Sequence, residues 1–333
     1  MNIGIVGSGS WGVALGTVLT NNKHEVLFLC NQEIQKDEIN SKHTLEIYAP
    51  GIDLGNHVKA TSSYKELLAF ASTIVIVVPS AAIEDVINKL RSEKIHNATL
   101  VIATKGLIHK ETINEFIRHK LDVRKNNIKI SILSGPSFAK FVLEKKITCV
   151  VSASKKMETA KEVAELFFNN YFRVYLSTDV NGVEFCGGFK NVIALGAGML
   201  DGRGEGSNAR AALISRGLFE MSKYARIFNV KKDTLYGLTG VGDLVLTATD
   251  MTSRNYSLGY YLGKGMPFEE ALIKVKTTAE SIVTIKELYE ISIENKIDSP
   301  IIQTIYGVLY VHKSIDECLA VLMNRAARNE FSE

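Results

Sequence analysis

The stretch Ile3–Gly16, IGIVGSGSWGVALG, decides the fold of this chain, because Gly7, Gly9 and Gly12 interrupt an otherwise apolar segment. A secretion signal needs a basic start and an unbroken apolar core. A buried helix would lose roughly 1 kcal/mol at each interior glycine. In a strand–turn–helix unit, by contrast, Gly7 permits the tight turn, Gly9 admits a pyrophosphate and Gly12 packs the helix on the strand. The stretch therefore predicts a dinucleotide-binding turn, with a glycine-rich packing turn as the alternative.

Length and composition indicate a soluble protein of two domains. The chain has 333 residues, of which 46% are hydrophobic and 23% charged. A net charge of +3 without a basic stripe argues against nucleic-acid binding. The apolar run STIVIVVP is too short to cross a bilayer, so we expect no integral membrane association.

The cysteines favour a cytoplasmic location. They are scattered, without CxxC or metal-ligand spacing: Cys30, Cys149, Cys186 and Cys318. We interpret them as reduced thiols, with pairing in an oxidising compartment as the alternative. No metal site is expected.

The two halves of the chain differ in pattern. Up to about Val180, short β-branched runs alternate with amphipathic helices, which indicates a parallel sheet covered on both faces. We predict an α/β fold with a doubly wound, Rossmann-type parallel-sheet domain over residues 1–185. The strand signals then fade, and residues 186–333 are predicted to form an all-α domain that binds the substrate.

Ligands of a doubly wound sheet bind at the carboxyl ends of its strands. Lys105 follows the apolar run TLVIA and is expected near the cofactor crevice, unless it is a solvated loop lysine. Gly135 and Ser137 follow the run ISILS, where a new helix is expected to offer free amides. An ordinary helix cap is the alternative there.

The helical domain supplies further candidates. Lys190 and Asn191 lie inside an apolar helix, where a lysine is costly unless it has a partner or a task. The alternative is a lysine that reaches solvent at a helix end. Asp243 follows a glycine turn and is either a site residue, an N-cap or both.

A second group of polar residues is suited to a phosphate. Arg254 stands between Ser253 and Asn255, and a guanidinium fork flanked by hydroxyl and amide donors matches a phosphate dianion. A surface loop arginine is the alternative.

Lysine is the expected proton donor, because the glycine-rich segments of the second half contain no histidine. A free lysine with a pKa of about 10.4 is a poor acid–base catalyst near neutrality. Burial and a second cation such as Lys105 would lower the pKa of Lys190 toward the working range.

The cofactor type stays open between NAD and NADP. No acid stands at the end of the second predicted strand to accept a ribose hydroxyl, and no arginine to accept a phosphate. Glu33 and Lys36 are the nearest charges.

Taken in order, the motifs GSGSWG, IATKG, LSGPSFAK, GGFKNVIALGAGMLDG, NARAALISRGLFEM, GVGDLVLT and TSRN closely resemble bacterial NAD(P)-dependent glycerol-3-phosphate dehydrogenases. The resemblance covers nearly the whole chain. It implies reversible hydride transfer between NAD(P)H and dihydroxyacetone phosphate, giving sn-glycerol 3-phosphate for phospholipid synthesis.

The resemblance also implies roles for residues. Lys190 would be the proton donor in reduction and the acceptor in oxidation, with Lys105 and Asp243 beside it. The positions that match substrate-site motifs are Lys105, Gly135, Ser137, Lys190, Asn191, Asp243, Ser253, Arg254 and Asn255. Besides the three glycines of the first turn, the positions that match cofactor-site motifs are Ser10, Trp11, Lys105, Ala139, Arg254 and Glu280.

Three features depart from the family pattern. The segment Thr278–Ser281 replaces a usual Val-Glu-Gly, and Phe189 stands where small or aliphatic residues are usual. The segment DGRGEGSNAR carries extra charge at Arg203 and Glu205. Two rivals remain. One is another two-domain dehydrogenase of the ketopantoate, 2-hydroxyacid or 6-phosphogluconate type, and the other is a non-catalytic dinucleotide sensor. The oligomeric state and feedback regulation stay open, with a homodimer through the helical domain as one option.

Overall fold

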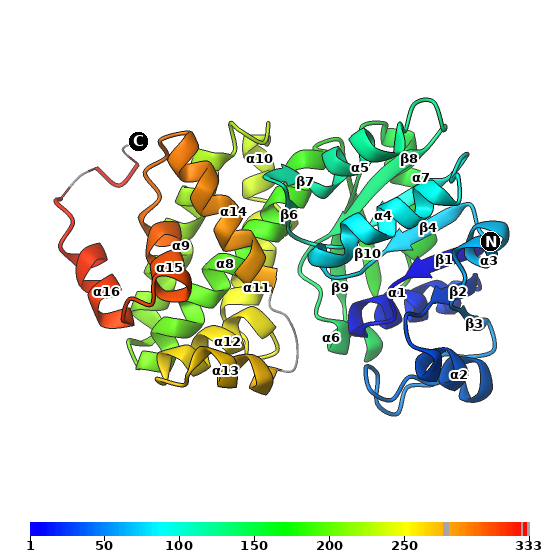
Figure 1. Cartoon of the computed structure of the whole chain (residues 1–333), viewed down its shortest axis with the longest axis horizontal. Coiled ribbons are helices and arrows are strands. Elements are labelled where there is room, and N and C mark those ends of the chain that lie inside the picture. Colours follow the sequence, from blue (N-terminus) through cyan, green and yellow to red (C-terminus); the bar gives the residue numbers. More distant parts are fainter. Residues whose placement is uncertain (276–279, 328, 332–333) are drawn as a thin grey trace. The chain divides into compact units, whose positions relative to one another are not determined.

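The computed structural model describes residues 1–275, 280–327 and 329–331. The chain divides into two compact units. The first comprises Met1–Thr104 and Ile113–Val180, and the second comprises Lys105–Thr112 and Asn181–Glu333. The short excursion at 105–112 thus belongs to the helical unit, although both its neighbours in sequence belong to the other (Figure 1).

The first unit is built on one sheet. Its strands, in spatial order, are β10 (Phe172–Ser177), β9 (Thr148–Ala153), β8 (Lys129–Ser134), β5 (Thr99–Ile102), β4 (Thr73–Ile76), β1 (Asn2–Val6), β2 (Glu25–Leu29) and β3 (Val58–Thr61). The order outward from β1 through β2 to β3, and through β4 and β5 on the other side, is that of a Rossmann-type domain and confirms the predicted fold class.

The direction of the last two strands differs from the prediction. β8 and β9 pair antiparallel, with Ile132 opposite Ala153, while β9 and β10 are parallel to each other. The turn begins at Gly135, whose φ of +150° suits glycine. A Cβ at Gly135 would lie 2.8 Å from the Cα of Val150, so glycine also allows the returning chain to pass close by.

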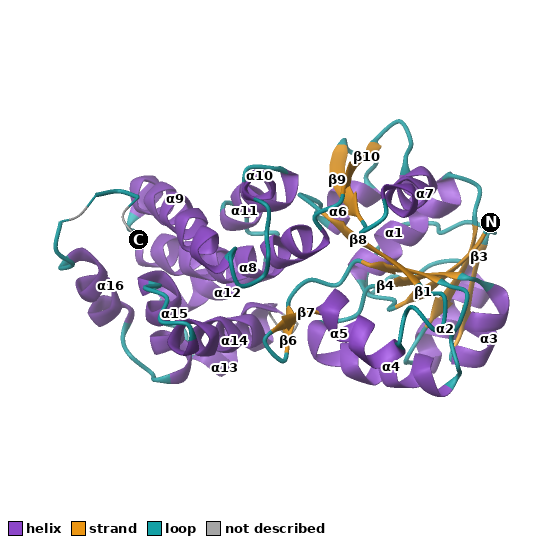
Figure 2. Ribbon diagram, turned by 90° about the horizontal axis from the view of Figure 1, so that it is seen from above, coloured by secondary structure: helices purple, strands orange, loops and turns teal. Residues whose placement is uncertain are grey.

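Helices cover both faces of this sheet. Figure 2 shows α1 (Ser10–Asn21) and α7 (Met157–Phe167) on one face and α4 (Ile83–Ser92) and α5 (Ile113–Leu121) on the other. The remaining helices of the unit are α2 (Glu33–Lys42), α3 (Tyr64–Phe70), the 3-10 helix η1 (Ser80–Ala82) and α6 (Ala139–Leu143). In α4 the buried positions follow helical spacing, and this explains the amphipathic pattern: Ile83, Val86, Ile87 and Leu90.

The regular structure described for the second unit is helical apart from the hairpin of β6 (Leu107–Ile108) and β7 (Glu111–Thr112). Its helices are α8 (Val180–Arg203), α9 (Gly206–Tyr224), α10 (Lys232–Leu235), the π-helical turn η2 (Leu238–Gly242), α11 (Asp243–Ala248), α12 (Arg254–Gly263), α13 (Phe268–Val275), α14 (Glu280–Glu294), α15 (Pro300–Tyr310) and α16 (Ile315–Met323).

The long helix α8 forms the core of this unit (Figure 1). By length and composition it could span a membrane, but the whole of its most apolar stretch is buried inside the protein. Glycines let α12 cross it at very short range. A Cβ at Gly198 of α8 would lie 2.0 Å from the carbonyl oxygen of Tyr256, and a Cβ at Gly259 of α12 would lie 1.9 Å from that of Leu195. The backbone that carries Lys190 and the backbone that begins at Arg254 are therefore locked together.

Candidate functional site

The first glycine turn has the geometry that its sequence predicts. Gly7 has a φ of +115°, and a Cβ there would lie 2.7 Å from the carbonyl oxygen of Val77. A Cβ at Gly12 would lie 2.1 Å from the carbonyl oxygen of Gly7, so only glycine at position 12 lets α1 pack this closely on the turn. At Gly9 an added Cβ would meet nothing within 4 Å. The space over Gly9 is therefore open to a ligand.

The first turn of α1 is suited to a pyrophosphate. Its N-cap Gly9 makes no side-chain cap bond, and no acidic residue stands in the first turn, which includes Ser10. The free amides and the helix dipole favour an anion there. The indole Nε1 of Trp11 is buried without a hydrogen-bond partner among the described residues, as expected if a bound molecule supplies the acceptor. These residues fit a dinucleotide.

At the end of β2, the two charges nearest the turn neutralise each other. Helix α2 begins at Glu33, whose carboxylate forms an ion pair with the ammonium group of Lys36 one turn on. On the same helix, Gln35 accepts a hydrogen bond from the Ser8 hydroxyl at 2.6 Å. The choice between the two nicotinamide cofactors therefore stays open at this end of the sheet.

The residues after β8 form a turn with an internal side-chain hydrogen bond. Ser137 donates a hydrogen bond to the carbonyl oxygen of Gly135 at 3.0 Å. Helix α6 begins only at Ala139, with Phe138 as N-cap and no side-chain cap bond. The interpretation of Ser137 as a helix cap is therefore wrong.

A lysine of the hairpin segment and a lysine of α8 meet at one carboxylate. Lys105 Nζ lies 2.7 Å from Asp243 Oδ2, and Lys190 Nζ lies 2.5 Å from Asp243 Oδ1. The side chains of Lys105, Lys190 and Asp243 are 19%, 6% and 1% exposed. The alternatives of a solvated Lys105 and a solvent-reaching Lys190 are wrong. We call these three residues the lysine–aspartate cluster.

Two glycines bring the hairpin onto α8. A Cβ at Gly188 would lie 3.1 Å from the Cα of Gly106, and Gly106 itself has a φ of +132°. Backbone therefore approaches this glycine-rich helix closely at Gly188. It delivers the adjacent Lys105 to Asp243.

The cluster shifts the pKa values of its members. Burial lowers the pKa of Lys190 from 10.5 to about 7, with Lys105 adding to the decrease and Asp243 opposing it. Burial raises the pKa of Asp243, but Lys105 and Lys190 outweigh it and hold that pKa below its usual value. The cluster therefore pairs an ionised carboxylate with a lysine that can exchange a proton near neutrality.

Asp243 does not cap its helix. It is the first residue of α11, and the N-cap is Gly242. One turn on, the Thr247 hydroxyl donates to Asp243 Oδ1 at 3.1 Å and accepts from Lys190 Nζ at 2.6 Å. Sequence analysis missed Thr247. Its spacing of one helical turn from Asp243 is the signal that could have found it.

The phosphate candidates lie at the start of α12. Ser253 is its N-cap and accepts from the amide of Tyr256 at 3.3 Å. Asn255 is buried, and its side-chain oxygen accepts from the amide of Ser281 in the first turn of α14 at 3.1 Å. Arg254, the first residue of the helix, is exposed. It stands at a helix N-terminus rather than in a loop, where amides and guanidinium favour the same anion.

The remaining candidates are placed as follows. Asn191 is buried beside Lys190 on α8, and Glu280 begins α14. Thr278 lies outside the described residues. Phe189 is fully buried, and its ring centroid lies 5.5 Å from that of Phe185 and 5.3 Å from that of Tyr224. The departure at Phe189 thus fills an aromatic core.

Known proteins resemble this chain over nearly its whole length. The family model for the N-terminus of NAD-dependent glycerol-3-phosphate dehydrogenase matches residues 2–160, and the model for the C-terminus matches residues 179–320. A glycerol-3-phosphate dehydrogenase [NAD(P)+] of Bacillus cytotoxicus is 40% identical over 98% of this chain and 96% of its own length. The Bacillus cereus protein of the same name is also 40% identical, over 98% and 97%.

Solved structures show the same relationship as the sequence comparisons. The crystal structure of glycerol-3-phosphate dehydrogenase from Coxiella burnetii has a TM-score of 0.93 and 33% identity, covering 97% of this chain and 99% of that one. A glycerol-3-phosphate dehydrogenase of Plasmodium falciparum has a TM-score of 0.87 at 24% identity, covering 99% and 97%, and shows the shared fold. With both halves matched in order, the chain belongs to the NAD-dependent glycerol-3-phosphate dehydrogenase family.

Proposed function

We propose that this chain catalyses the reversible reduction of dihydroxyacetone phosphate to sn-glycerol 3-phosphate with NADH or NADPH. The observation that carries the proposal is the lysine–aspartate cluster: a buried lysine with a pKa of about 7, beside a second lysine and an ionised aspartate. The family relationship and the open glycine turn support it.

In the proposed mechanism, the nicotinamide supplies or accepts the hydride when bound. Lys190 donates a proton to the reacting carbonyl oxygen in reduction and removes it in oxidation. Lys105 polarises the same oxygen with its positive charge. Asp243 holds both ammonium groups in place, and the Thr247 hydroxyl accepts a further hydrogen bond from Lys190.

The helix N-terminus at Arg254 is proposed to hold the substrate phosphate. Arg254 offers a two-pronged donor, and the neighbouring Ser253 and Asn255 are fixed by hydrogen bonds to Tyr256 and Ser281. Because glycines lock α12 against α8, this anion site keeps a constant distance from Lys190. The residues proposed for the cofactor are Gly7, Gly9, Ser10, Trp11, Gly12, Lys105, Ala139, Arg254 and Glu280. For the substrate, Gly135, Ser137 and Asn191 complete the proposed set.

A cytoplasmic location fits the four free cysteines and the burial of α8. A homodimer stays a hypothesis that sedimentation of the purified chain tests.

The deciding experiment is oxidation of NADH and of NADPH by the purified chain, each with dihydroxyacetone phosphate, ketopantoate or no ketone. We expect turnover with dihydroxyacetone phosphate, and the ratio of the two cofactor rates reports the preference. Turnover with ketopantoate alone would establish the rival dehydrogenase. Cofactor binding without any turnover would establish the sensor.

A further inference from the structure

The hairpin that carries Lys105 is attached to α14 by one carboxylate. Glu287 Oε1 accepts from the backbone amide of His109 at 3.1 Å, and Glu287 Oε2 accepts from the amide of Lys110. Both oxygens of one side chain are thus used on consecutive amides. The turn that they hold connects Ile108 of β6 to Glu111 of β7.

This turn has an unusual backbone. His109 and Lys110 have φ values of +51° and +64°, the conformation in which asparagine and glycine are the usual residues. Residues in such a conformation persist where the surroundings over-determine them, and such places cluster at functional sites. Two charge-assisted hydrogen bonds, donated by these amides to Glu287, help to hold the turn in this conformation.

The hairpin leads directly to the lysine–aspartate cluster. Leu107 of β6 is buried in the core of the helical unit, and Gly106 lies against Gly188. Only Gly106 separates Lys105 from Leu107, the first residue of β6. A turn fixed at one end by Glu287 therefore fixes the ammonium group at the other end.

We propose that Glu287 is a positioning residue for the reaction, which clamps the 105–112 hairpin to α14 and thereby holds the Lys105 ammonium group at Asp243. The proposal deepens the proposed function and rests on it. It adds to the active-site residues a carboxylate on α14 whose described hydrogen bonds go to the hairpin turn and not to Lys105 or Lys190.

The clamp has a measurable consequence at Lys190. Lys105 contributes to the lowering of the Lys190 pKa, so a hairpin released from α14 removes part of that effect. The midpoint at which Lys190 titrates then rises from about 7 toward its ordinary value of 10.5. A structural role of Glu287 alone would lower the unfolding temperature without moving this midpoint.

The helix offers a matched control. Glu290 also lies on α14, and among the described residues its carboxylate pairs with the Lys110 ammonium group, at 3.2 Å, rather than with a backbone amide of the hairpin. That pair is 36% and 40% exposed, and exposed pairs contribute little. Glu290→Ala therefore removes the same charge from the same helix and leaves the amide clamp intact.

The experiment measures two quantities in the full-length wild type, Glu287→Ala, Glu287→Gln and Glu290→Ala. One is the pH dependence of kcat for dihydroxyacetone phosphate reduction, and the other is the Lys190 midpoint from NMR of isotope-labelled lysine. For Glu287→Ala we expect kcat to fall roughly 10- to 100-fold, as for a misplaced group, and the midpoint to rise. Glu287→Gln, which keeps one acceptor oxygen, should lie between this variant and the wild type. Glu290→Ala should stay within about twofold of the wild type.

Two results would overturn the proposal: an unchanged Lys190 midpoint in both Glu287 variants, or equal losses in Glu287→Ala and Glu290→Ala. If Glu287→Ala does not fold, the milder Glu287→Gln decides by the same midpoint. A raised midpoint in a protein whose wild type does not reduce dihydroxyacetone phosphate would support the clamp and refute the proposed function instead.

Discussion

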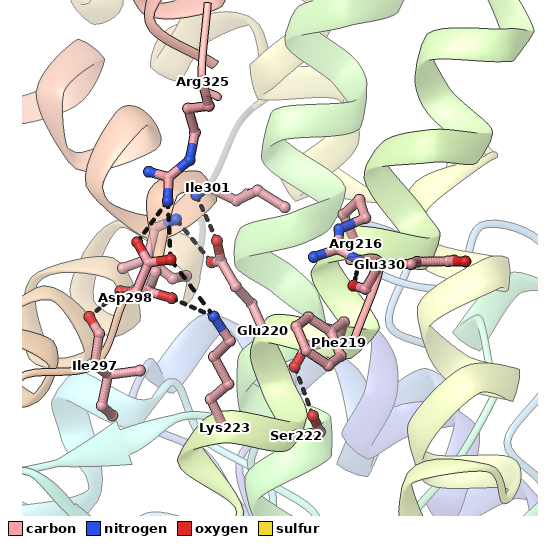
Figure 3. Close-up of polar contacts among 12 residues, drawn as sticks. Arg216, Phe219, Glu220, Ser222, Lys223, Ile297, Asp298, Ile301, Arg325 and Glu330 are labelled. Atoms are coloured by element: carbon pink, nitrogen blue, oxygen red, sulfur yellow. Dashed lines mark hydrogen bonds and ion pairs between the residues drawn. The ribbon is translucent and has the colours of Figure 1, made fainter. Parts of the chain in front are cut away.

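Asp243 and Glu220 are both buried carboxylates of the helical unit, yet their pKa values move in opposite directions. Asp243 lies between two ammonium groups, which outweigh burial and keep its pKa low. Glu220 accepts from the backbone amides of Ile301 and Ile302 in the first turn of α15, the first of them at 2.6 Å (Figure 3). There burial prevails and raises the pKa to about 7.

The difference shows that neighbouring full charges lower the pKa of a buried carboxylate where a helix dipole does not. The end of a helix carries about half an elementary charge, which satisfies a carboxylate's hydrogen bonds without repaying its desolvation. Around Glu220, Lys223 donates to the backbone of Asp298 at 2.7 Å, and Arg325 contacts both carboxylate oxygens of Asp298 at 2.8 Å (Figure 3). We infer that Glu220 caps α15 and joins helices. A shifted pKa therefore marks two different tasks in one unit.

The largest expected effect separates the two regions by activity. Lys190→Ala should lower turnover by at least about 100-fold, the range of a general acid–base group, while NADH binding remains. Lys223→Ala, a partly buried lysine beside Glu220, is the matched control and should keep turnover within a few-fold of the wild type. Steady-state kinetics with a fluorescence titration of NADH measure both. Near-normal turnover of Lys190→Ala would remove it from the proposed role.

The second prediction uses stability. The Glu220 carboxyl binds its proton more tightly in the folded than in the unfolded protein. Below its ordinary pKa of 4.5 it is protonated in both states, and between pH 4.5 and about 7 the unfolded state loses the proton first, so the free energy of unfolding decreases. Stability should therefore fall by roughly 3 kcal/mol as the pH rises through that window. Glu220→Gln, which mimics the protonated form, should lose this slope.

Urea unfolding at several pH values measures the effect. Lys190 gives the opposite sign, because its folded pKa lies below its unfolded one and stability rises with pH between about 7 and 10.5. An identical slope below pH 7 in Glu220→Gln and wild type would show that Glu220 is not the titrating group.

A third prediction compares two arginines. Arg254→Ala should weaken binding of the phosphorylated ketone by roughly 1.5–3 kcal/mol, since charged hydrogen bonds are lost. The Michaelis constant should rise about 10- to 150-fold, and Arg325→Ala should leave it unchanged. An unaltered Michaelis constant in Arg254→Ala would place the phosphate elsewhere.

The smallest effect concerns the ion pair beside Glu220. Arg325 and Asp298 are 33% and 37% exposed, so Arg325→Ala should cost about 0.2–1 kcal/mol of stability. Thermal unfolding of the variant measures this. A loss several times larger would mean that the pair, rather than the Glu220 cap, holds this region together.

The sequence predicted those features that depend on local chemistry. Gly12 has the close contact that a glycine motif implies, because its contact with Gly7 lies within one strand–turn–helix unit, whereas Gly7 itself approaches Val77 after β4. Lys190 was recognisable because a lysine in an apolar helix needs a partner. Its lowered pKa was expected from burial and a second cation, and the structure shows both causes.

Features that depend on distant contacts were not predictable. An apolar run does not encode strand direction, so the reversal after β8 was missed. The segment at 105–112 carries no composition signal, and its membership of the helical unit arises from Gly188 and Glu287, far along the chain. The domain boundary at residue 185 stays an expectation beside the chain division at Val180.

The most direct test of the central claim is the titration of the Lys190 side chain itself. NMR of isotope-labelled lysine, with the signal assigned by its loss in Lys190→Ala, gives the midpoint in the wild type and in Lys105→Met. The lysine–aspartate cluster predicts a midpoint near 7 that rises when Lys105 is replaced. A wild-type midpoint near 10.5, or one unmoved by Lys105→Met, would contradict it.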